Sequence, residues 1–354
     1  MVNRKGFKVS LFTLFDLFTI HVSPFTPLNS KGVKMYGNFY SGKRVLVTGG
    51  LGFIGLNTCA RLLDLRAEVT AMDNFVPPRI TPAFDAVRSR LRLAIADIRD
   101  AEKVERVVRD QEVIFNLAGK SGAADSNKTP LNDLDINCRG HLTVLEACRT
   151  FNPGVTVVFP SSRLVYGKPL YLPVDEKHPL APESIYAAHK LAVENYHLIY
   201  GKLHGLKATV LRISNPYGPF QAGEGRAYGI ANSFIQAAVS GRPITMFGDG
   251  SQRRDYLYID DLVEALLRAA SAPESRGMIY NIGDGKGTSL LELAELAVEE
   301  AGQGSIVRVP WPEEYRAIET GDYLSDISLA RHDLDWSPGT DIREGVGRTA
   351  ASYR

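Results

Sequence analysis

A glycine-rich turn between a short apolar run and a helix-like segment constrains this chain more than any other feature. The run Arg44–Thr48 is rich in β-branched residues and predicts a buried strand, while residues 53–66 carry apolar side chains at helical spacing. Between them, Gly49, Gly52 and Gly55 permit a tight turn and a close approach of the backbone to a pyrophosphate. The free N–H groups and partial positive charge at a helix start favour phosphate there. The turn therefore predicts a dinucleotide-binding unit.

Strands and helices alternate as far as Ile213. Further strands are predicted at residues 68–72, 91–96, 113–117, 155–159 and 207–213, and helices at residues 101–109, 131–149 and 184–203. Such alternation indicates an α/β fold of the Rossmann type, a doubly wound parallel sheet with helices on both faces.

Beyond Asn215 the alternation loosens, and helices at residues 260–270 and 289–301 stand among loops. We expect residues 43–215 to form the dinucleotide-binding domain, with later segments returning to it. Residues 216–354 should form mainly a smaller α/β substrate-binding cap.

The first 42 residues differ from the rest. Residues 1–8 are basic and residues 9–20 are apolar except for Thr, Ser and Asp16. This run is too short to span a bilayer, and the interrupting Asp16 and the lack of a clear cleavage site argue against a signal peptide. We interpret residues 1–42 as a disordered or non-native leader, with Met35 as the functional start, because the periodic pattern begins near Lys43.

Acidic residues follow the second and third predicted strands. Asp73 ends the second strand, where a carboxylate accepts hydrogen bonds from both hydroxyls of an adenosine ribose. It would repel a 2′-phosphate, and the next arginine is Arg79, so the predicted cofactor is NAD and not NADP. Asp97 and Ile98 close the third strand at the same edge, where they would meet the adenine or form a simple turn.

A tyrosine and a lysine lie four residues apart in the predicted helix 184–203. Tyr186 and Lys190 therefore share one helix face. The ordinary pKa of a tyrosine hydroxyl is about 10. The positive charges of a lysine ammonium and of the nicotinamide would lower this pKa, so that the tyrosine could act as a base near neutral pH. Ser162 follows the strand 155–159, at the edge where such sheets present ligands. These three residues form a candidate catalytic set.

The net charge and the Cys and His content bear on which partners, cellular setting and metals the chain could have. The chain has 41 Lys and Arg against 40 Asp and Glu, which gives no electrostatic case for nucleic acid or an anionic membrane. Cys59, Cys138 and Cys148 form no C-x-x-C pair and favour a reducing, cytoplasmic setting. The histidines lack metal-ligand spacing, so no metal site is predicted.

Together these motifs resemble the extended short-chain dehydrogenase/reductase family, in its nucleotide-sugar epimerase/dehydratase branch and closest to UDP-glucose 4-epimerase-like members. The resemblance extends from about Lys43 to Thr349. Beyond the motifs above, it rests on residues 116–119 (NLAG), 137–147 (NCRGHLTVLEA), 161–167 (SSRLVYG), 211–219 (LRISNPYGP), 248–256 (GDGSQRRDY) and 280–283 (YNIG).

The resemblance implies a role for each matching residue. Tyr186 would be the catalytic base, Lys190 its electrostatic partner and a ribose ligand, and Ser162 the contact to the sugar hydroxyl. The cofactor would be bound by Gly49, Gly52, Phe53, Ile54, Gly55, Asp73, Asn74, Asp97, Ile98, Leu117, Ala118, Gly119, Asn137, Tyr186 and Lys190.

The same resemblance implies that a nucleotide-diphosphate sugar is the substrate. Asn215 and Arg254 would bind its diphosphate, where a forked guanidinium suits phosphate oxygens. Arg316 matches a second phosphate arginine, but Ile318 and Glu319 replace the Gly-Asp that usually follows. The family also implies a homodimer packed through the helices 131–149 and 184–203.

The two residues after Ser162 bear on the reaction type. Dehydratases of the family have an Asp-Glu pair there, and decarboxylases keep the Glu, whereas this chain has Arg163 and Leu164. Neither can exchange a proton at a working pH. We therefore expect epimerisation, at C4 through a 4-keto sugar. A dehydratase or decarboxylase is the alternative, followed by a reductase that releases its cofactor and by a non-catalytic nucleotide-binding protein.

Overall fold

The structure, a computed structural model, describes the whole chain except residues 1–35, 37, 75–84, 86 and 222–228. Its centre is a sheet of seven parallel strands in the order β3-β2-β1-β4-β5-β6-β11. The strands are β1 (Arg44–Thr48), β2 (Glu68–Asp73), β3 (Arg92–Ile95), β4 (Val113–Asn116), β5 (Thr156–Ser162), β6 (Lys207–Ile213) and β11 (Ile279–Ile282). This sheet confirms the predicted Rossmann fold.

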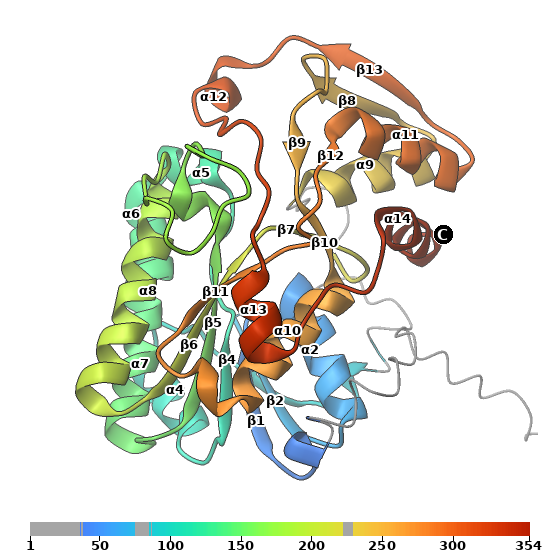
Figure 1. The fold of residues 1–354 in the computed structure, drawn as a ribbon. Coiled ribbons are helices and arrows are strands. Elements are labelled where there is room, and N and C mark those ends of the chain that lie inside the picture. Colours follow the sequence, from blue (N-terminus) through green and yellow to red (C-terminus); the bar gives the residue numbers. More distant parts are fainter. Residues whose placement is uncertain (1–35, 37, 75–84, 86, 222–228) are drawn as a thin grey trace, which may run out of the picture.

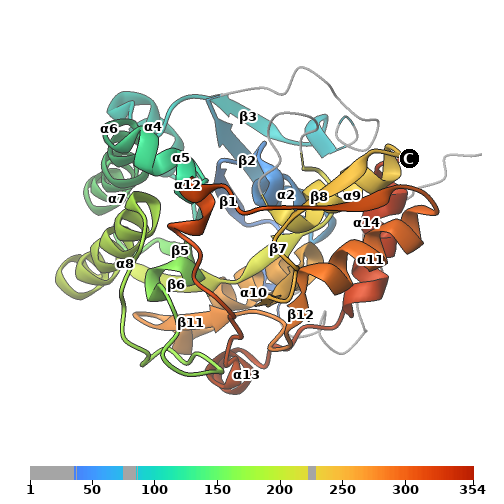
Figure 2. The same cartoon turned by 90° about the horizontal axis from the view of Figure 1, so that it is seen from above.

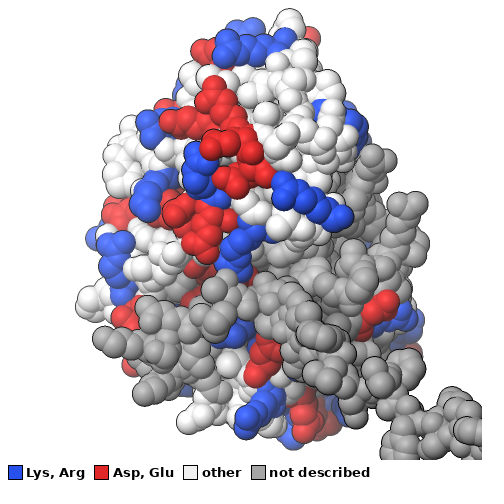
Figure 3. Space-filling model, turned by 90° about the vertical axis from the view of Figure 1, so that its right-hand side faces the viewer, with Lys and Arg blue, Asp and Glu red and all other residues white. Residues whose placement is uncertain are grey.

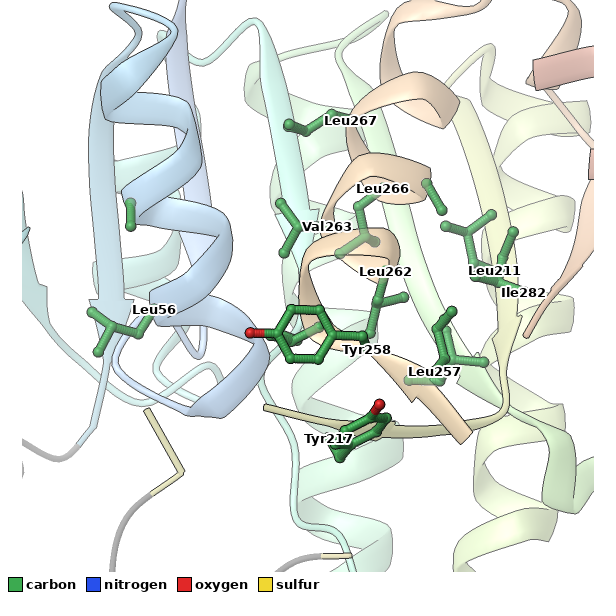
Figure 4. Close-up of a cluster of buried hydrophobic side chains, with 14 of the residues drawn as sticks. Leu56, Leu211, Tyr217, Leu257, Tyr258, Leu262, Val263, Leu266, Leu267 and Ile282 are labelled. Carbon is green, nitrogen blue, oxygen red and sulfur yellow. The ribbon is translucent and has the colours of Figure 1, made fainter. Parts of the chain in front are cut away.

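Helices cover both faces of the sheet (Figures 1 and 2). One face packs against α2 (Phe53–Asp64) and α10 (Ile259–Ser271), and the other against α4 (Ala101–Val108), α7 (Gly140–Phe151) and α8 (Ile185–His204). In Figure 4, Leu262 and Leu266 of α10 lie towards Leu211 of β6 and Ile282 of β11. Strands buried on both faces explain why β1 and β4 are almost wholly apolar.

The predicted helix at residues 131–149 is three consecutive helical pieces. They are α6 (Pro130–Leu134), a π-helical turn η1 (Asp135–Arg139) and α7. A π-turn inside a helix often marks a functional site. Here it carries Asn137, which is buried beside the loop that follows β4.

The smaller lobe is built mainly after Asn215. Its elements are β7 (Asn215–Tyr217), α9 (Ile230–Val239), β8 (Pro243–Phe247), β9 (Arg253–Arg254), β10 (Tyr256–Tyr258), β12 (Thr288–Ser289), α11 (Leu290–Ala301), β13 (Ser305–Val309), α12 (Glu313–Arg316) and α14 (Ile342–Ser352). Helix α13 (Ser328–Leu334) packs instead against β11 and α10 of the sheet domain. Helices α9, α11 and α14 pack together beside the parallel pair β8–β13. Although α10 and β11 fall within residues 216–354, they belong to the central sheet.

The right-hand face of the molecule carries charges of both signs (Figure 3). Acidic side chains gather on the smaller lobe, where Arg343 pairs with Glu299 and Glu300. Among the described residues, no helix is long and apolar enough to cross a membrane, and no cluster of His, Cys, Asp or Glu is placed to hold a metal ion. All three cysteines are buried and unpaired.

The packed region begins before the predicted boundary at Lys43. Tyr36 and Tyr40 are fully buried against α10. The Tyr40 hydroxyl donates to the carbonyl of Leu267 at 2.7 Å, and the Tyr36 hydroxyl bonds the carboxylate of Glu264. The prediction that all of residues 1–42 form a leader is therefore wrong for this last part, while residues 1–35 lie outside the described residues.

We predict that a chain beginning at Met35 unfolds at a clearly higher temperature than one beginning at Lys43. The shorter chain loses two buried aromatic side chains, each worth about 3–5 kcal/mol in comparable core truncations. Thermal unfolding of the two truncated proteins measures the difference. Tyr40→Phe is the matched control, because it removes only one hydrogen bond and should cost about 1 kcal/mol. Equal melting temperatures for the two truncations would contradict the prediction.

Candidate active site

The turn between β1 and α2 depends on glycine for steric reasons. Gly49 has a positive φ of 65°, and a Cβ there would lie 2.8 Å from the Cα of Ala118. A Cβ on Gly55 would lie only 2.0 Å from the carbonyl oxygen of Gly49. Helix α2 starts at Phe53 without a side-chain cap, so its first N–H groups remain available to an anion. The turn has the form that a pyrophosphate site requires.

Asp73 lies beside this turn. Its Oδ2 accepts a hydrogen bond from the N–H of Leu51 at 3.1 Å. Because Asp73 ends β2 next to the strand that feeds the glycine turn, its carboxylate borders the predicted nucleotide site.

A second acidic residue, Asp97, lies beyond the neighbouring strand β3. Asn74 donates to its carboxylate at 2.9 Å, and Arg99 pairs with it at 2.8 Å. These contacts, the Arg99 hydrogen bond first, hold the pKa of Asp97 well below its usual range. Arg99 also pairs with Asp135 at 2.8 Å, so this cation is already engaged by two carboxylates. Sequence analysis did not single out Arg99.

The loop after β4 forms the opposite wall. Thr48 Oγ1 donates to Asn116 Oδ1 at 3.0 Å and accepts from the N–H of Ala118 at 3.1 Å, which ties the ends of β1 and β4 together. The side-chain amide of Asn137 accepts from the N–H of Lys120 at 2.9 Å and donates to its carbonyl at 2.8 Å. Asn137 therefore shapes the loop around Leu117 and Gly119 through Lys120.

The three candidate catalytic residues meet at the carboxyl end of β5. Ser162 is the last residue of that strand, and Tyr186 and Lys190 lie one turn apart on α8. The Lys190 ammonium donates to the carbonyl of Pro160 at 2.9 Å and lies 5.8 Å from the centre of the Tyr186 ring. The sequence-predicted set is thus brought together.

The surroundings of Tyr186 within the protein raise the pKa of its hydroxyl. Burial raises the pKa of Tyr186, the charge of Asp133 raises it further, and a hydrogen bond with Ser162 opposes them. Burial also lowers the pKa of Lys190 to about 8, against the opposing effects of Glu194 and Asp133. Both effects disfavour a phenolate beside an ammonium, so the predicted contribution of the nicotinamide charge to the base stays a prediction.

A buried polar network lies next to the candidate catalytic residues. Glu194, one turn beyond Lys190 on α8, pairs with Arg212 of β6 at 2.7 Å and accepts from the Ser161 hydroxyl at 2.5 Å. Arg212 donates to the Tyr166 hydroxyl at 3.0 Å. Sequence analysis missed this network, although Glu194 continues the four-residue spacing of Tyr186 and Lys190.

The residues expected at the diphosphate lie at the border with the smaller lobe. Asn215 in β7 donates through its side-chain amide to the carbonyl of Asp255 at 2.9 Å. Arg254 in β9 is buried, forms an ion pair with Glu319 and donates to the carbonyl of Gly321 at 2.5 Å.

Arg316 takes a different position from the one expected. It lies exposed on α12, and its guanidinium forms no ion pair or hydrogen bond with the described residues. Glu319, three residues later, is the residue that reaches Arg254. A contact between Arg316 and the substrate diphosphate stays a prediction.

Comparison with known proteins identifies the family. Residues 45–283 match the model of the family described as "NAD dependent epimerase/dehydratase family". The chain is 35% identical over 305 residues to a putative UDP-glucose 4-epimerase of Methanocaldococcus jannaschii, covering 86% of this chain and 96% of that protein. It is 34% identical to the UDP-glucose 4-epimerase of Mycolicibacterium smegmatis, with 88% and 98% covered.

A solved structure agrees with these relatives. The UDP-glucose 4-epimerase of Thermus thermophilus in complex with NAD superposes with a TM-score of 0.77 at 31% identity, over 88% of this chain and 98% of that one. The glycine turn, the Tyr186/Lys190 pair and the doubly wound sheet all lie within the matched region. The chain belongs to the NAD-dependent epimerase/dehydratase family.

Proposed function

We propose that this protein interconverts nucleotide-diphosphate sugars that are epimers at C4, by way of a 4-keto sugar. The observation that carries the proposal is the combination of an assembled Ser162/Tyr186/Lys190 set with Arg163 and Leu164 directly after it. Burial and repulsion by Arg254 lower the pKa of Arg163 to about 10, so it remains a cation at neutral pH. Leu164 has no ionisable group. At these two positions the chain therefore lacks the acid–base residues that elimination or decarboxylation would require.

The cofactor of the family is NAD, and the residues of the site fit it. The glycine turn leaves room for a pyrophosphate, Asp73 can take an adenosine ribose, and Arg99 is already engaged by two carboxylates. When bound, NAD accepts and returns the hydride of the reacting sugar carbon.

The chain's own residues move the proton. Ser162 bonds the C4 oxygen, and Tyr186 takes its proton when the cofactor's cation offsets the burial that holds Tyr186 neutral. Lys190, fixed by the carbonyl of Pro160, contributes a second positive charge. Tyr186 returns the proton after the sugar has presented its other face.

Product analysis tests this function. The protein with NAD is incubated with UDP-glucose, UDP-galactose and other nucleotide hexoses, and the products are identified by NMR. We expect an epimer, with no net NADH. A stable 4-keto-6-deoxy sugar or released CO₂ as the main product would overturn the proposal.

Tyr186→Phe should bind NAD and substrate but turn over at least about a hundred-fold more slowly, the scale of losing a general acid–base group. Steady-state rates together with ligand titrations separate the two effects. Near-normal turnover would move the base elsewhere. The next candidate is His189, whose Nδ1 lies 2.7 Å from Asp133 Oδ1.

Asp73→Ala should weaken NAD binding more than its effect on thermal stability explains. The variant loses the carboxylate that would accept from the ribose hydroxyls. Fluorescence titration with NAD and NADP provides the measurement, and tighter binding of NADP by the unaltered protein would show that the role given to Asp73 is wrong.

Arg254→Ala should raise the substrate KM sharply while leaving NAD affinity nearly unchanged. A charge-assisted contact to the substrate diphosphate is worth about 1.5–3 kcal/mol. Asp255 and Asp260 do not compete for this arginine, because Asp255 accepts from backbone N–H groups and Asp260 pairs with Arg348. Equal loss of both ligands would instead assign Arg254 to the ion pair with Glu319 alone.

A cytoplasmic homodimer is the form that we propose for this enzyme. Leu131 and Leu134 on α6 and Ile199 and Leu203 on α8 are large apolar side chains exposed on the helices expected at the interface. Light scattering at micromolar concentration should give the mass of a dimer, and Leu203→Asp should shift it towards the monomer. A monomeric unaltered protein would contradict this.

A further inference from the structure

Arg163 is a buried cation with no ion-pair partner among the residues that the structure describes. The residue is 7% exposed at the start of the short 3-10 turn Arg163–Tyr166 that follows β5. Its Nη1 donates to the Thr320 hydroxyl at 3.1 Å, and its Nε reaches Asn215 Oδ1 only at 3.4 Å. Among the described residues, no carboxylate lies within ion-pairing distance of its guanidinium.

Other buried arginines of the chain are neutralised. Arg212 pairs with Glu194 at 2.7 Å. Arg254 pairs with Glu319, whose same oxygen also accepts from the N–H of Gly321. Glu319, whose charge raises the pKa of Arg163, is therefore already paired with Arg254, and burial and the repulsion of Arg254 outweigh its effect on that pKa. A buried charge of this kind is expensive unless a ligand supplies the opposite charge.

The position of Arg163 shows which part of the substrate it meets. It follows Ser162, which is expected to contact the sugar, and its guanidinium carbon lies 5.0 Å from the centre of the Tyr323 ring. Its Nε lies 3.4 Å from Oδ1 of Asn215, and the charge of Arg254 acts on it, so it also borders the expected diphosphate contacts. Arg163 is thus adjacent both to the expected sugar contact and to the expected diphosphate contacts.

We infer that Arg163 is a specificity residue that binds a carboxylate on the sugar, so that the preferred substrate is a nucleotide-linked acidic sugar such as a uronic acid. The inference rests on the proposed function of the site. A forked guanidinium matches a carboxylate with two parallel hydrogen bonds, and a hydroxymethyl group at the same place would leave the charge unpaired. A guanidinium binds a phosphoryl group equally well, so Arg163 could instead bind the substrate diphosphate. The experiment below distinguishes a sugar carboxylate from the diphosphate.

The experiment measures binding to the NAD-loaded protein by calorimetry, with UDP-glucose and UDP-glucuronic acid as the probes. The unaltered protein should bind the acidic sugar more tightly. Arg163→Gln keeps a donor for Thr320 but removes the charge. It should reduce the affinity for UDP-glucuronic acid, relative to that for UDP-glucose, by about ten- to a hundred-fold, the scale of a charge-assisted contact.

Arg254→Gln is the matched control. It should weaken both ligands by the same factor, because both carry the diphosphate. If Arg163→Gln also weakens both equally, Arg163 binds the diphosphate and the inference is overturned. Absence of any preference for the acidic sugar in the unaltered protein would overturn it as well, whether or not the variant folds.

Thermal unfolding of ligand-free Arg163→Gln supplies a second readout. Because it removes an unpaired buried charge, the variant should melt at the same or a higher temperature, whereas a structural arginine would make it melt lower. Neither measurement needs turnover. If no sugar is epimerised, the proposed function fails, while the affinity ratio still tests Arg163.

Discussion

The buried ion pair between Glu194 and Arg212 holds together the part of the molecule on which the candidate active site is built. It joins α8 to β6, and the bond from the Ser161 hydroxyl brings in the end of β5. Because Tyr186, Lys190 and Glu194 recur every four residues, fixing Glu194 also fixes the rotation of α8 and the direction in which Tyr186 points. Removing one partner of such a pair typically costs about 3–5 kcal/mol.

Burial of the candidate catalytic side chains opposes the ionisation that proton transfer requires. It raises the pKa of Tyr186 and lowers that of Lys190, so both effects disfavour a phenolate–ammonium pair. The hydrogen bond between Tyr186 and Ser162 opposes the rise for Tyr186, and Glu194 opposes the fall for Lys190, but neither reverses the effect of burial. In the proposed mechanism the positive charge of the cofactor would offset the burial of Tyr186, so that proton transfer would depend on occupation of the cofactor site.

Local sequence patterns predicted the elements well and the long-range partners poorly. Six of the seven strands of the sheet were recognisable as short apolar runs bounded by Gly or polar residues, and Lys207–Ile213 was predicted with its observed bounds, whereas β11 was not predicted. Tyr36 and Tyr40 were missed because their contacts, Glu264 and Leu267, lie more than two hundred residues away and no short period connects them. The same limit hid Arg99 and the Glu194 network. It also hid the ion pair between Arg254 and Glu319.

The charges beside Ser162 connect reaction type with substrate. An acidic pair at the positions of Arg163 and Leu164 could protonate and deprotonate the sugar during elimination. An arginine stays protonated, so it can bind an anion but cannot exchange a proton. Of the two buried guanidinium groups at this place, Arg254 pairs with Glu319, whereas Arg163 has no carboxylate within ion-pairing distance among the described residues. In the proposed substrate complex, the diphosphate would replace the carboxylate of Glu319 at Arg254, and a carboxylate on the sugar would pair with Arg163. Under this proposal, the arginine that stands in place of the dehydratase acid–base pair also selects an acidic sugar.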